Sequence, residues 1–142
     1  MILPDVNVLV YAFRPEVEHH AVCRRWLREV IFGTSQFGMS HAVLAAVVRI
    51  TTNHRIYKEP SSLTDAVGFC EDLLGQPHCR LIEPGAHHWD IFKHLCIETN
   101  TTGGRVTDAW YAALAIEWGC EWITFDRDYA RFPGLKWSIP AA

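Results

Sequence analysis

The sequence has little that would cross-link the chain. Its five cysteines are an odd number at wide spacings, and no two of them form a Cys-x-x-Cys pair. This pattern disfavours both a disulfide framework and a zinc knuckle, because each needs cysteines at characteristic close spacings. The fold must therefore be stabilised mainly by a hydrophobic core.

Long hydrophobic runs and an excess of positive charge are also missing. The uncharged apolar runs, such as residues 42–48, are too short to cross a bilayer, and no basic segment follows Met1. We therefore expect a cytoplasmic protein with no membrane partner. The net charge of -3 argues against broad electrostatic binding of nucleic acid, but it is compatible with a local basic rim around an acidic centre.

The chain does have the composition of a packed domain. It contains 142 residues, of which 49% are hydrophobic and 20% are charged. A chain of this length can bury roughly 70% of the surface that it exposes when unfolded. We predict a single domain spanning residues 1–142.

Short apolar runs alternate with amphipathic segments along the chain. The predicted strands are residues 2–5, 37–39, 80–83, 122–125 and 136–139, and the predicted helices are residues 16–32, 41–52, 62–74, 88–99 and 106–118. Residues 5–7 are predicted to turn the chain between the first strand and the first helix. The alternation predicts an α/β fold with a mainly parallel sheet covered by helices on both faces.

Four aspartates lie at the ends of predicted strands or at the start of a predicted helix: Asp5, Asp108, Asp126 and Asp128. In an open α/β sheet such strand ends converge where ligands bind. Carboxylates gathered there repel one another, which raises their pKa values unless a cation neutralises them. The pattern therefore favours a Mg²⁺ or Mn²⁺ site.

Each acidic position also has an explanation that needs no metal. Asp5 and Asn7 fit an Asx turn or a helix cap, Asp108 fits a helix N-terminus, and Asp126 and Asp128 fit a solvated turn. These alternatives account for single positions, whereas a shared site accounts for the pattern as a whole.

Four sequence blocks place these acids in a larger context. They are ILPDVNVL at residues 2–9, VLAAVVR at 43–49, VTDAWYAALA at 106–115 and ITFDRDY at 123–129. With these blocks in this order, the chain resembles the PIN-domain ribonucleases, and among them the VapC-type toxins of bacterial type II toxin-antitoxin systems. The resemblance covers essentially the full length.

The resemblance implies a three-layer α/β/α domain with a central, mainly parallel sheet. It also implies Mg²⁺- or Mn²⁺-dependent endonucleolytic cleavage of structured RNA such as tRNA or rRNA, inhibition by a small VapB-type antitoxin, and a homodimer. Within the family pattern, Asp5, Asp108 and Asp126 match acidic metal ligands, Asp128 matches an auxiliary acid, and Asn7 and Thr107 match supporting polar positions. Five arginines near the predicted strand ends are candidates to line the RNA path: Arg14, Arg49, Arg105, Arg127 and Arg131.

Ala46 departs from the family pattern, which usually has a glutamate at this place. A methyl group cannot ligate a metal, so we expect weaker metal retention and slower cleavage with the fold intact. Two explanations are open: the natural protein lacks the acid, or the chain was altered to silence a toxic nuclease.

Two other functions compete with the ribonuclease. The first is a non-catalytic PIN-like module that binds RNA or an antitoxin without cutting. The second is a haloacid-dehalogenase-like phosphatase, which also begins with an aspartate after its first strand. That enzyme needs a general acid two residues later, and Asn7 cannot donate a proton in that way.

Overall fold

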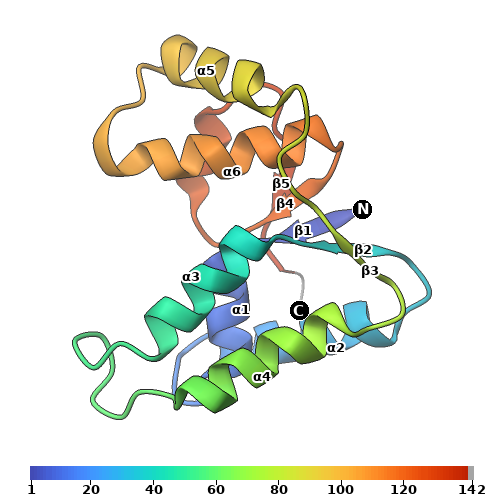
Figure 1. The fold of residues 1–142 in the computed structure, drawn as a ribbon, viewed down its shortest axis with the longest axis vertical. Coiled ribbons are helices and arrows are strands. Elements are labelled where there is room, and N and C mark those ends of the chain that lie inside the picture. Colours follow the sequence, from blue (N-terminus) through green and yellow to red (C-terminus); the bar gives the residue numbers. More distant parts are fainter. Residues whose placement is uncertain (141–142) are drawn as a thin grey trace.

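A parallel β-sheet lies between two groups of helices in the computed structural model, which describes residues 1–140 (Figure 1). The strands are β1 (Ile2–Pro4), β2 (Phe37–Met39), β3 (Cys79–Leu81), β4 (Glu121–Ile123) and β5 (Trp137–Ser138). The helices are α1 (Val6–Phe13), α2 (His20–Phe32), α3 (His41–Thr51), α4 (Leu63–Leu74), α5 (His88–Thr99) and α6 (Val106–Glu117), with short 3-10 helices η1 (Gly103–Arg105) and η2 (Arg127–Arg131).

The layers match the predicted α/β/α class. Helices α5 and α6 lie on one side of the sheet, and α1 to α4 lie on the other (Figure 1). Strand β4 pairs in parallel with both β1 and β5, and β2 pairs in parallel with β3. Strand β1 also lies against β2, so the three-stranded sheet β1-β4-β5 and the two-stranded sheet β2-β3 lie side by side in one layer. The carboxyl ends of β1 and β4 therefore meet at one edge of the sheet.

Helix α1 is the main departure from the predicted elements. Residues 5–7 were expected to form a turn, yet α1 begins at Val6 and Asp5 is its N-cap. The valines in this segment favour strands by intrinsic propensity, but burial of Val8, Leu9 and Ala12 against the rest of the fold selects the helix. The next helix, expected from residue 16, begins only at His20.

The other predicted strands and helices are present with small shifts of their ends. The largest shifts are in β3, which covers Cys79–Leu81 instead of residues 80–83, and in β4, which covers Glu121–Ile123 instead of residues 122–125. Ser40 and Ser62 cap α3 and α4 as expected, through bonds from the backbone N–H groups of Val43 and Asp65. Local signals thus placed most of the elements correctly.

The core lies on both faces of the sheet. Its largest fully buried side chains include Trp122 on β4, Leu3 on β1 and Phe37 on β2. Helix α6 packs closely through four buried alanines, Ala109, Ala112, Ala113 and Ala115, because small side chains permit a close approach. None of the helices found in residues 1–140 is long and apolar enough to span a membrane.

Candidate functional site

Three of the predicted acids line one cavity at the carboxyl ends of β1 and β4. Asp5 follows β1 directly, and its backbone N–H donates to the carbonyl of Ile123 over 2.8 Å. Asp126 follows β4, and Asp108 lies in the first turn of α6. The cavity has a volume of about 350 Å³, and it is also lined by other residues that the sequence singled out: Asn7, Ala46, Arg49 and Thr107. We call it the acidic cavity.

Thr124 connects the residues of this site. Its hydroxyl donates to Asp5 Oδ2 over 2.7 Å and accepts the backbone N–H of Asp126 over 3.0 Å. The Asn7 side chain lies 3.3 Å from the same hydroxyl and 3.5 Å from Asp5 Oδ2. The sequence did not indicate a role for Thr124, because it is one residue of the predicted strand 122–125 that precedes Asp126.

Asp5 is buried in a setting that opposes its charge. Only 6% of the Asp5 residue is exposed to solvent. This burial, helped by the nearby charges of Asp108 and Asp126, raises the pKa of Asp5 to about 6, although hydrogen bonds from Thr124 and Val6 oppose the rise. Ionised Asp5 therefore lacks a sufficient counter-charge from the protein itself.

Asp108 is held by two residues of η2. The hydroxyl of Tyr129 donates to Asp108 Oδ1 over 3.3 Å, and a guanidinium nitrogen of Arg131 lies 4.0 Å from Oδ2. Partial burial and the charge of Asp126 still raise the pKa of Asp108. Burial and the neighbouring Asp5 and Asp108 raise the pKa of Tyr129 strongly, so this phenol stays a neutral donor.

Asp128 stands apart from the other three acids. It is exposed and does not line the acidic cavity. Its carboxylate pairs with Arg105 over 3.1 Å, and its backbone N–H donates to Asp126 Oδ1 over 2.9 Å. In this structure Asp128 helps to shape the turn that presents Asp126.

The chemistry of the acidic cavity fits a hard divalent cation in part. Carboxylate oxygens are suitable ligands for Mg²⁺ and Mn²⁺. The raised pKa of Asp5 shows that its ionised form is disfavoured, and a bound cation would favour that form. Within residues 1–140, however, no three Asp, Glu, His or Cys side chains are grouped closely enough to hold one ion. Because Mg²⁺ usually keeps several waters and takes one or two carboxylates, Asp5 and Asp108 fit an ion held partly through water.

Ala46, where the family resemblance predicts a glutamate, also lines the acidic cavity. It lies on α3 with 8% exposure and contributes a methyl group to the wall of the acidic cavity. An acidic side chain at position 46 would extend from the wall of the same cavity that Asp5, Asp108 and Asp126 line.

Comparison with known proteins decides the family. Residues 2–135 match the PIN domain family. The chain belongs to the PIN domain family. Ribonuclease VapC43 of Mycobacterium tuberculosis is 37% identical over 140 residues, covering 99% of this chain and 95% of the relative. Ribonuclease VapC25 of the same organism is 36% identical over 136 residues, covering 96% of each chain. The chain is thus a PIN domain of the VapC group.

Solved structures support the PIN fold independently. VapBC2 from Rickettsia felis aligns with a TM-score of 0.71 at 17% identity and covers 98% of each chain. VapC20 of Mycobacterium tuberculosis, described as a sarcin-ricin loop cleaving toxin, aligns with a TM-score of 0.69 at 15% identity, covering 96% of this chain and 99% of VapC20. The predicted PIN fold and VapC-type family are confirmed, and the phosphatase alternative is excluded.

Proposed function

We propose that this PIN domain is the ribonuclease toxin of a VapBC-type toxin-antitoxin pair and hydrolyses structured RNA, tRNA or rRNA, with Mg²⁺ or Mn²⁺. One observation carries the proposal: Asp5, Asp108 and Asp126 come from distant parts of the chain and line one cavity. The relatives named above, ribonucleases similar over nearly the whole chain, support the same activity.

Asp5 and Asp108 would hold the cation in this proposal. When bound, the ion would supply a water of lowered pKa and stabilise the developing negative charge. Thr124 keeps the Asp5 carboxylate in place, and Tyr129 keeps that of Asp108. Asp126, the remaining acid of the cavity, is the candidate to orient the attacking water.

Arg49 gives the acidic cavity a cationic wall. It is exposed on α3 and lines the cavity together with the three carboxylates. A guanidinium there suits a phosphate of the RNA backbone, since phosphates are the commonest nucleic-acid contact of arginine. Such a local contact is compatible with the negative net charge of the chain.

The proposed partners follow from the same assignment. Several structures of similar fold are of VapBC complexes, including those of Rickettsia felis and nontypeable Haemophilus influenzae. We infer a VapB-type antitoxin as the partner of this chain, and we retain the homodimer as a prediction. Size-exclusion chromatography of the chain alone and with its antitoxin tests both assignments.

Ala46→Glu is the decisive variant for catalysis. We expect it to raise metal-dependent RNA cleavage by roughly tenfold or more, because one more carboxylate strengthens a site for a hard cation. The measurement is cleavage of total tRNA and rRNA with Mg²⁺, with Mn²⁺ and with chelator. Asp5→Ala in the same background is expected to abolish the gain, and unchanged cleavage in that double variant would show that the catalytic assignment is wrong.

A non-catalytic PIN module is the second candidate, and the composition of the cavity favours it. Ala46 replaces the expected acid, and no three suitable ligands are grouped within residues 1–140. This candidate expects no metal-dependent cleavage from the chain or from Ala46→Glu, while RNA or antitoxin binding persists.

A further inference from the structure

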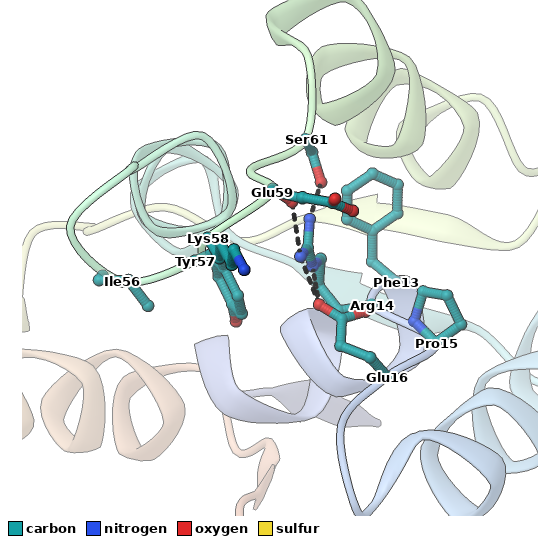
Figure 2. A pocket seen from close by; sticks show the side chains of 9 residues that line it. All are labelled: Phe13, Arg14, Pro15, Glu16, Ile56, Tyr57, Lys58, Glu59 and Ser61. Carbon is teal, nitrogen blue, oxygen red and sulfur yellow. Dashed lines mark hydrogen bonds and ion pairs between the residues drawn. The ribbon is translucent and has the colours of Figure 1, made fainter.

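A second cavity lies beside the acidic cavity and shares one wall with it. It has a volume of about 660 Å³ and is formed by the end of α1 and the loop between α3 and α4 (Figure 2). Tyr57, on that loop, lines both cavities. A ligand that extends from one cavity to the other would therefore contact Tyr57.

Arg14 holds this wall in place. Its guanidinium donates to Glu16 Oε1 over 2.6 Å, to Ser61 Oγ over 3.0 Å and to the carbonyl of Glu59 over 2.9 Å (Figure 2). It also stands 4.1 Å from the centre of the Tyr57 ring. Arg14 thus ties the loop to the end of α1 and lies against the Tyr57 ring, which gives it a positioning role. Its contact with RNA stays a prediction.

The second cavity has the chemistry of a nucleobase site. Its apolar surface comes from Phe13, Pro15, Ile56 and the Tyr57 ring. Its charges are balanced, since Arg14 and Lys58 face Glu16 and Glu59. A balanced site has little attraction for a bare phosphate, whereas a flat, neutral base gains from an aromatic face and from acceptors for its N–H groups.

Glu59 supplies such an acceptor. Arg14 binds the backbone carbonyl of Glu59, which leaves the exposed carboxylate to accept N–H groups of a base. The cavity volume lies within the range of about 300–1,000 Å³ that is usual for small-ligand sites, so a nucleoside fits.

We propose that the second cavity binds an unpaired nucleobase of the RNA, adjacent to the scissile phosphate, with the base on the face of the Tyr57 ring that Arg14 does not cover. This inference rests on the proposed function, because it requires RNA to occupy the acidic cavity. A splayed-out base is the usual target of specific RNA recognition, since only an unpaired base offers both its face and its edges. The second cavity would then contribute to the choice of RNA target.

A double-mutant cycle between protein and RNA tests the proposal. Short single-stranded RNAs, intact or with one abasic position moved along the strand, are bound in chelator to the chain and to Tyr57→Ala. For the chain itself, we expect one abasic position to weaken binding about tenfold, the usual scale of base stacking on an aromatic side chain. With Tyr57→Ala, the same abasic position should cause almost no further loss.

Two variants serve as controls. Tyr57→Phe keeps the ring and should keep the tenfold dependence on the base. Tyr11→Ala removes an aromatic side chain that lines only the acidic cavity, so it should keep that dependence too. Equal abasic losses in the chain and in Tyr57→Ala would overturn the proposal, as would RNA binding that no abasic position affects or the absence of RNA binding.

A measurement on the unaltered chain covers the case in which Tyr57→Ala does not fold. Titration with the RNA should shift the backbone amide signals of Ile56 and Lys58 in NMR spectra, and the matching abasic RNA should not. Shifts of equal size with both RNAs would overturn the proposal. Because binding is measured in chelator, failure of the proposed nuclease activity is distinguished from failure of the base site.

Discussion

At the scale of single residues, Asp5 has the clearest energetic consequence. Folding raises its pKa from 3.8 to about 6, chiefly through burial. The folded state therefore binds more protons than the unfolded state between these pH values, and stability falls as pH rises through this window. Above it, ionised Asp5 destabilises the metal-free fold by roughly 3 kcal/mol, at about 1.4 kcal/mol for each pKa unit.

Asp5→Asn should remove this penalty while keeping the cap of α1. We expect metal-free Asp5→Asn to be more stable than the unaltered chain by roughly 1–3 kcal/mol near neutral pH, and the gain to vanish below the unfolded pKa of Asp5. Urea unfolding in chelator at several pH values measures the difference. Asp90→Asn, at an exposed site on α5, is the matched control and should change little at any pH. A gain for Asp5→Asn that is independent of pH would contradict the explanation.

At the scale of elements, the contact between β1 and β2 helps to set the position of Asp5, which directly follows β1. Gly38 on β2 lies so close to its neighbours that an added Cβ would approach Ile82 Cγ1 to 2.8 Å and the backbone oxygen of Ile2 to 3.3 Å. The Ile2 oxygen belongs to β1, the strand that leads directly into Asp5. A side chain added at Gly38 would therefore press on β1.

Gly38→Ala should destabilise the protein by about 1–3 kcal/mol, the usual cost of overpacking a core. Urea unfolding measures this loss. Gly104→Ala is the control, since an added Cβ there meets nothing within 4 Å. Equal stability of the two variants would show that β2 moves away from β1 without cost.

The elements also show how far local patterns reach. Caps at Ser40 and Ser62 and the alanine-rich face of α6 were readable, because these signals depend on neighbours in sequence. Helix α1 was not readable, because its valines favour a strand and only its burial in the fold favours a helix.

At the scale of the whole molecule, the acidic cavity exists only in the folded chain. Asp5 and Thr124, which share a hydrogen bond, are 119 positions apart in sequence. An ion that requires Asp5 and Asp108 together would bind the folded state in preference to the unfolded state, and would stabilise it by mass action. The unfolded chain offers only scattered single carboxylates.

Mn²⁺ should therefore raise the thermal midpoint of the chain in a concentration-dependent way, by a few degrees for about 1 kcal/mol of binding energy. Differential scanning fluorimetry measures the shift, with KCl of matched ionic strength as the control. Asp5→Asn should lose most of it. A shift that KCl reproduces would indicate general screening of charge and no bound ion.

The sequence by itself determined the family, the alternation of strands and helices, and a set of four candidate acids, because motif order and local periodicity are properties of the chain. It also singled out Ala46, where the family resemblance predicts an acid. Only the tertiary structure decided that Thr124 joins Asp5 to Asp126, that Asp128 stands outside the acidic cavity, and that Tyr57 borders two cavities. These features depend on which distant segments pack together, and that is set by the order of strands and the burial of whole helices.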